Sequence, residues 1–77
     1  MEITKDSVRE HFGCKTLSFR TSHCISQEAM ARQLKIAVRS YIDLEHGVCS
    51  PSGVTILKFI QLLSPAERES FFTDLLD

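Results

Sequence analysis

The sequence predicts an all-α fold, a compact domain of five helices, on three observations. Apolar residues recur at steps of three and four along the chain, which is the helical period, and no stretch alternates at period two. Good helix caps precede the apolar stretches, the clearest being Ser64-Pro65-Ala66-Glu67, with Pro at the first helical position and Glu at the third. Glycine and proline total only five, so turn signals are few.

Composition and length predict one small globular domain over residues 1–77, with 43% hydrophobic and 25% charged residues. A chain of this size buries only about 60% of its unfolded surface, so a partner subunit is an expected source of stability. No apolar run approaches the roughly 20 residues that span a membrane. The N-terminus has no basic-then-apolar signal-peptide pattern, so we expect a cytoplasmic protein without a membrane partner.

The first predicted helix begins at Thr4 or at Ser7, each of which heads a capping pattern, and ends near Ser22 or His23. Its apolar face falls at steps of four, four and three residues: Val8, Phe12, Thr16 and Phe19. Gly13 lies inside this helix and is expected to weaken it by about 1 kcal/mol relative to Ala.

Two short helices joined by a tight turn are predicted over residues 26–34 and 38–46. Ser26 is a good N-cap for the first, because its hydroxyl can accept a hydrogen bond from a backbone N–H in the first turn. Met30 and Leu34 are four residues apart and form a narrow apolar stripe on this helix.

In the second of these helices, Tyr41 and Leu44 are three apart and face the same way, which predicts a core position for both. Ile36, in the turn, can fill the gap between the two helices. Gly47 follows the second helix as a residue that ends helices in a left-handed conformation. Because helices this short are not stable alone in water, the rest of the chain must hold them.

Two further helices are predicted over residues 53–63 and 65–76. The first is capped by Ser52 and is apolar around most of its circumference, so it is expected to be buried on more than one side. The second has adjacent apolar residues that one small body cannot all cover, so we expect it to face a second copy of the chain. The predicted dimer-interface residues are Phe71, Phe72, Leu75 and Leu76.

The cysteines and histidines do not indicate a metal site or an enzyme. Neither a Cys-x-x-Cys nor a His-x-x-x-His spacing occurs among Cys14, Cys24, Cys49, His11, His23 and His46, and a structural zinc site uses four ligands at short spacings. With no export signal, three cysteines are expected to be free thiols. No oxyanion loop accompanies a nucleophile, so we expect no catalysis. We also expect no bound metal, no cofactor and no small-molecule ligand.

A set of residues in the middle of the chain is specific in combination: Ser26-Gln27-Glu28-Ala29-Met30-Ala31, Leu34, Ile36, Glu45, Gly47, Pro51-Ser52 and Leu63. Over about residues 12–63 it resembles the XRE/Cro family of helix-turn-helix DNA-binding domains. The resemblance implies a lambda-repressor-like fold with a helix-turn-helix core at 26–46. The sequence departs from the family at Cys24 and Lys35, where Gly and positive φ are common, and at Ala37, where a Ser or Thr cap is usual.

The resemblance implies that residues 38–46 enter the major groove and contact base edges. The implied DNA-contacting residues are Gln27, Val38, Arg39, Ser40, Ile42, Asp43 and His46. Arg39 would donate two hydrogen bonds to guanine, Asp43 would accept one from cytosine, and Val38 would contact a thymine methyl group. Gln27, at the start of the supporting helix, would contact the phosphate backbone or help to read the bases.

Several of these residues also have ordinary structural interpretations. Arg39 and Asp43 are four apart and could form a surface ion pair worth only tenths of a kcal/mol. Structural or solvated roles are the alternatives for four others: Arg20, Gln27, Glu45 and His46.

The expected function is sequence-specific binding of double-stranded DNA by a homodimeric transcription regulator, most simply a repressor; an antitoxin or a mobile-element regulator fits the same pattern. The alternative is a protein–protein interaction module on this fold with little DNA affinity. Apolar Ile42, anionic Asp43 and a net charge of −1 favour that alternative. Residues 1–63 carry eight Lys or Arg and six Asp or Glu, which is only mildly basic.

Overall fold

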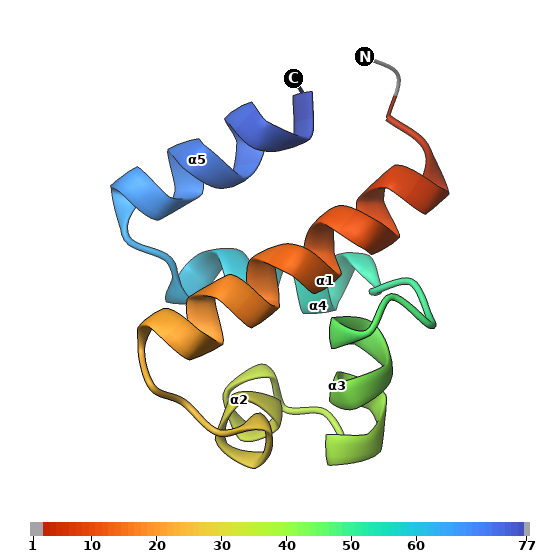
Figure 1. The fold of residues 1–77 in the computed structure, drawn as a ribbon, viewed down its shortest axis with the longest axis vertical. Coiled ribbons are helices and arrows are strands. Elements are labelled where there is room, and N and C mark those ends of the chain that lie inside the picture. Colours follow the sequence, from red (N-terminus) through yellow and green to blue (C-terminus); the bar gives the residue numbers. More distant parts are fainter. Residues whose placement is uncertain (1–2, 77) are drawn as a thin grey trace.

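The structure, a computed structural model, describes residues 3–76, which form five α-helices and contain no strand. The helices are α1 (Lys5–Ser22), α2 (Gln27–Leu34), α3 (Val38–Glu45), α4 (Gly53–Leu62) and α5 (Pro65–Leu76). In Figure 1, α1 crosses the middle of the molecule, with α2 and α3 on one side of it, α5 on the other, and α4 passing behind. The all-α prediction is confirmed. None of the helices within this described range combines the length and apolar character needed to cross a membrane.

Side-chain caps mark where four of the helices begin. Thr4 and Ser7 form a reciprocal capping box, in which each backbone N–H donates to the other's hydroxyl, at 2.9 and 3.1 Å, so α1 starts at the earlier of the two predicted positions. Ser26 accepts from Ala29 N at 3.1 Å at the start of α2, as predicted. Such caps satisfy backbone donors that the first helical turn leaves free.

The last helix begins with the strongest capping signal of the sequence. Ser64 N donates to Glu67 Oε1 at 2.8 Å, and Glu67 N donates to Ser64 Oγ at 3.2 Å. By contrast, Ala37 at the start of α3 makes no side-chain cap bond. The third helix therefore depends on tertiary contacts more than its neighbours do.

Two non-glycine residues adopt the left-handed conformation at the ends of α1 and α2. These are Cys24, with φ 55°, and Lys35, with φ 57°. After Lys35 turns the chain, Ile36 N donates to Ala31 O at 3.0 Å, which satisfies a carbonyl at the end of α2. A side chain at such a position costs about 1 kcal/mol relative to Gly, and the turn it makes leads directly into α3.

The core is built around aromatic rings from α1, α4 and α5. Phe59 lies at its centre, with ring-centroid distances of 5.4 Å to Phe12, 5.6 Å to Phe19 and 5.9 Å to Phe71. All three pairs meet edge to face, an arrangement that contributes roughly 0.5–1.5 kcal/mol per pair beyond area burial. Leu63, at the end of α4, is also buried, and the remaining buried apolar residues join α2 and α3 to this centre: Met30, Ala31, Leu34, Tyr41 and Leu44.

The fourth helix is less buried than its composition predicts. Thr55 and Phe59 point into the core, but Val54 and Leu57 are 62% and 63% exposed. The expectation that this helix is buried on more than one side is therefore wrong for the isolated chain. Apolar residues lie around most of α4, but the rest of the chain buries only the side with Thr55 and Phe59 and leaves the side with Val54 and Leu57 exposed.

Gly13 allows α1 to approach the end of α3. A Cβ built at Gly13 would lie 2.9 Å from both the Leu44 and the Glu45 carbonyl oxygen. We expect Gly13→Ala to lower the free energy of unfolding by roughly 1–3 kcal/mol through overpacking, although Ala is the better helix former. Urea denaturation tests this, with Gly53→Ala, where a Cβ meets no atom within 4 Å, as the control. A stabilised Gly13→Ala variant would contradict this close approach.

Candidate nucleic-acid interface

One side of α3 faces solvent and the other is anchored in the core. Tyr41, Leu44 and Glu45 are buried, and the residues that the family resemblance implies as DNA contacts lie at the other positions of the helix. Arg39, Ser40 and His46 are exposed, Val38 is 38% exposed, and Ile42 and Asp43 are half-buried. Figure 1 shows α3 at the edge of the molecule, next to α2 and away from α5. The six predicted residues of α3 and its C-cap are therefore all at least partly accessible, and we call the surface that they line the α3 face.

The predicted alternative of an ion pair on the α3 face is not formed. Among the ion pairs of residues 3–76, none joins Arg39 to Asp43. The Arg39 guanidinium therefore extends from an exposed position without a carboxylate holding it to the helix.

A buried carboxylate holds α3 in place. Glu45, whose side chain is 3% exposed, accepts two hydrogen bonds from Arg20 on α1, from Nε at 2.8 Å and from Nη2 at 3.0 Å. Tyr41 Oη donates to the same carboxylate at 2.5 Å, and Gln27 Nε2 donates at 3.1 Å. Arg20 Nη1 also donates to Ile25 O at 3.2 Å. This Glu45 network connects α1, the loop after it, α2 and α3.

The charges of the Glu45 network reinforce one another. Burial alone raises the pKa of Glu45, but hydrogen bonds from Arg20, Tyr41 and Gln27 outweigh it and hold the pKa below its ordinary value. The pKa of Arg20 is raised, chiefly by its hydrogen bond to Glu45. Burial, and then the bond to Glu45, raises the pKa of Tyr41. At neutral pH the network is therefore a charged pair with a neutral phenol, and a bidentate Arg–carboxylate bond orients its parts.

The Glu45 network settles which role Arg20 and Glu45 have within the chain: both pair internally. Gln27, which the resemblance implies as a DNA contact, is half-buried and donates to Glu45. Sequence periodicity could not reveal this set, because Arg20 and Glu45 lie 25 residues apart on different helices. The sequence offered one signal: Arg20 and Glu45 are charged residues on the inner faces of amphipathic helices, and buried charges need partners.

The surface around α2 and α3 is mildly cationic. Arg32, Lys35 and Arg39 are exposed there, against Glu28 and the half-buried Asp43. Because Arg20 neutralises Glu45, the buried network adds no net charge. The electrostatic field of this surface attracts a polyanion only weakly, so the binding of such a partner would depend on individual contacts more than on the overall charge.

The other predicted site residues differ in how deeply they are buried. Phe71 is 5% exposed and packs in the core, which removes it from the predicted dimer interface. Phe72 and Leu76 are 46% and 53% exposed, and Leu75 is half-buried, so these three form an accessible apolar strip on α5. Cys14, Cys24 and Cys49 are free and exposed. No group of three potential metal ligands occurs in the part of the chain that the structure describes.

Comparison with family models, with curated proteins and with solved structures found no match.

Proposed function

We propose that this chain is a sequence-specific DNA-binding transcription regulator with a lambda-repressor-like helix-turn-helix domain of the XRE/Cro type. In this proposal α2 lies across the DNA backbone and the α3 face enters the major groove. The observation that carries it is the combination of a left-handed Lys35 turn between two short helices and an α3 whose inner side is locked while its outer side is exposed. A helix presented rigidly in this way suits base readout.

Within the α3 face, Arg39 is the strongest candidate for base recognition. It is exposed near the start of α3, where a guanidinium can reach guanine O6 and N7 together. Val38, which is 38% exposed, would contact a thymine methyl group. Gln27 takes a different role from the one its position suggests: through Glu45 it positions the helix, and the backbone N–H groups at the start of α2 remain for a phosphate.

Repression by blocking polymerase is the simplest mechanism for a DNA-binding domain of this size, and we propose that it acts as a homodimer. Two chains of 33 × 25 × 19 Å can present their α3 helices about 34 Å apart, in successive major grooves. The apolar strip Phe72, Leu75 and Leu76 supports α5 as the contact between copies, because isolated proteins rarely expose adjacent large apolar residues without a partner.

Phe72→Glu is expected to convert a dimer to the 8.7 kDa monomer in sedimentation equilibrium, because it introduces a charge into the α5 strip. Thr73→Glu adds the same charge at an exposed neighbouring position and should leave the dimer intact. An unchanged mass for Phe72→Glu would place the interface elsewhere, and a monomeric parent chain would remove the dimer from the proposal.

Selection from a random duplex pool, read at two salt concentrations, tests the function itself. A regulator that contacts several phosphates should enrich a palindromic sequence at low salt and lose affinity steeply at higher salt. The second candidate, a protein-interaction module, is favoured by Asp43 on the α3 face and by exposed Val54 and Leu57. That candidate predicts no enriched sequence and no DNA binding above a nonspecific, salt-sensitive background.

A further inference from the structure

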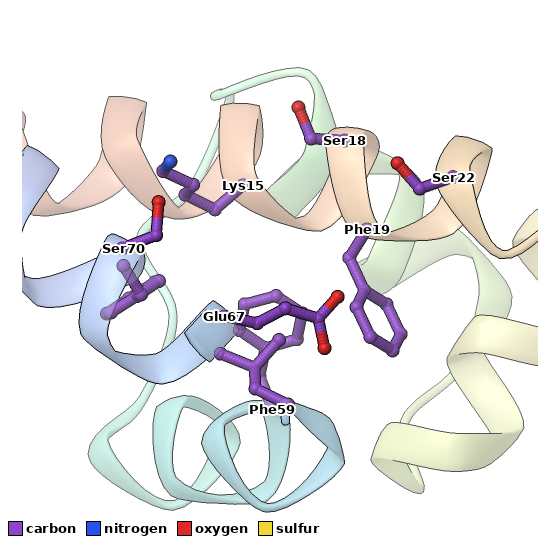
Figure 2. Close-up of a pocket in the computed structure, with 9 residues that line it drawn as sticks. Lys15, Ser18, Phe19, Ser22, Phe59, Glu67 and Ser70 are labelled. Atoms are coloured by element: carbon purple, nitrogen blue, oxygen red, sulfur yellow. The ribbon is translucent and has the colours of Figure 1, made fainter. Parts of the chain in front are cut away.

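The last helix, α5, is attached to the rest of the chain by one buried side chain and several polar contacts. Of its residues only Phe71 is buried. A solvent-open cleft of about 160 Å³ lies between α1, α4 and α5. Figure 2 shows Lys15 and Ser18 on the α1 side of this cleft and Glu67 and Ser70 on the α5 side. Because α5 has so little apolar packing against its neighbours, its polar contacts with α1 matter more for holding it in place.

Two of the side chains that tie α1 to α5 are histidines. His11 Nε2 lies 2.8 Å from Phe71 O, and because a carbonyl oxygen only accepts, the ring nitrogen is the donor. His23 Nε2 lies 3.0 Å from Glu67 Oε2. The Ser64 backbone N–H, and then the His23 ring, hold the pKa of Glu67 below its ordinary value. The Glu67 carboxylate is therefore ionised at neutral pH, and the His23 ring donates to it.

The His23 ring is held in position by α1 itself. It lies against the Phe19 ring, with centroids 4.3 Å apart, and His23 is the C-cap of α1, where the helix dipole favours a positive charge. Arg20, one turn earlier, is paired with Glu45. These contacts all lie outside α5 and persist if α5 moves away, whereas the contact with Glu67 is lost. The contact with Glu67 therefore links the charge of His23 to the docking of α5.

The other charged groups near the two histidines come from α1 and α5. Lys15 pairs with Asp74. This pairing, chiefly, and the charge of His11 among smaller causes hold the pKa of Asp74 below its ordinary value, so His11 faces a carboxylate as well. On α4 the one charged residue is Lys58, which forms no ion pair within residues 3–76. Lys15 opposes a charge on His11, so we expect the larger effect from His23.

We propose that α1 and α5 form a pH-sensitive contact, in which protonation of His23 and His11 holds α5 more firmly against α1. A protonated imidazole makes a charge-assisted hydrogen bond, which is stronger than the bond made by the neutral ring. Histidine changes its charge between about pH 5 and 8. The added stability is present at the acid end of this range and is lost as the pH rises through it. This contact belongs to the fold and does not depend on DNA binding or on a dimer.

Hydrogen exchange of the α5 amides, followed by mass spectrometry and corrected for the intrinsic exchange rate at each pH, tests the proposal. Between about pH 6 and about pH 8, the protection of α5 in the parent chain should fall by about two- to fivefold, the contribution of a partly exposed charged contact. The double variant His11→Gln, His23→Gln keeps a side-chain N–H donor at each position but has no ring that titrates. Its α5 protection should stay constant over this range.

Two single variants complete the test, and the second keeps it decisive if the double variant does not fold. His46→Gln removes an exposed histidine at the C-cap of α3, away from α5 (Figure 1), and should keep the pH dependence of the parent. Glu67→Gln removes the charge that His23 faces but keeps an oxygen that can accept from Ser64 N, and it should remove most of the dependence.

Measurements at two protein concentrations separate docking within one chain from association between chains. A fall in α5 protection that is independent of concentration, and that the His11→Gln, His23→Gln or the Glu67→Gln substitutions remove, supports the proposal. Constant protection in the parent, an undiminished fall in these variants, loss of the dependence in His46→Gln, or a fall seen only at the higher concentration would each overturn it.

Discussion

Replacing Glu45 by Ala is expected to lower the free energy of unfolding by roughly 3 kcal/mol, the lower end of the range for removing one partner of a buried ion pair. The lower end applies because the Arg20 side chain retains 18% exposure. The substitution leaves the Arg20 guanidinium with only its bond to Ile25 O, and the Tyr41 hydroxyl without the carboxylate that accepts its hydrogen bond. For a domain of this size that loss is a large share of the total stability. Urea denaturation, read by far-ultraviolet circular dichroism, measures it.

An exposed ion pair and a double variant control for this prediction. Asp6→Asn breaks the Arg9–Asp6 pair, in which the Asp6 side chain is 76% exposed, and should cost under about 1 kcal/mol. Combining Arg20→Met with Glu45→Met removes both buried charges and should recover part of the loss. If Glu45→Ala costs no more than Asp6→Asn, the Glu45 network does not hold α3 in place.

The same residue gives the fold a dependence on acid. Because its folded-state pKa lies below the ordinary value of 4.5, Glu45 contributes stability above that value, and this is lost as pH falls through the lower folded-state pKa. The parent chain should therefore lose stability on acidification below pH 4.5 by more than Glu45→Ala does. Urea midpoints at a series of pH values make that comparison.

Arg39→Ala is expected to weaken binding to a selected operator by roughly 1–3 kcal/mol, which is about 5- to 150-fold in Kd. The side chain is exposed and forms no ion pair within residues 3–76, so its removal should leave the fold intact. Fluorescence anisotropy with the operator and with a scrambled duplex measures the specific and nonspecific affinities separately.

Arg32→Ala is the matched control, because it removes the same charge from an exposed position on α2. A cation that contacts only phosphates should affect the operator and the scrambled duplex equally. Arg39→Ala should instead reduce the ratio of the two affinities. Parallel losses in both variants would assign Arg39 to the phosphate backbone, and an unchanged operator affinity would remove it from the interface.

Local signals in the sequence were sufficient to predict the helices and most of their ends. The Ser26 and Ser64 caps are formed as predicted. Cys24 and Lys35 have positive φ, at positions where the family resemblance leads one to expect it. Each of these features depends on residues a few positions apart, so a short stretch of sequence contains all the residues that form it.

Contacts between distant helices could not be predicted in the same way. In the sequence, Gly13 looks like a residue that weakens its helix. Its role in the fold is to leave room for carbonyl groups of α3, which lie more than 30 residues further along the chain. Likewise, the tie between Gln27 and Glu45 depends on how α2 and α3 meet. The burial of Phe71 beside exposed Phe72 depends on the angle at which α5 packs against α1. Periodicity gives the face of a helix but not the neighbour it meets.

NMR contacts between the protein and a bound duplex test most directly whether the outer side of α3 touches base pairs. In the complex with the selected operator, the methyl groups of Val38 and Ile42 should show nuclear Overhauser effects to thymine methyl or cytosine H5 protons, which lie in the major groove. Protein–DNA effects that arise only from other helices, with none from these methyl groups, would contradict the proposed mode of binding.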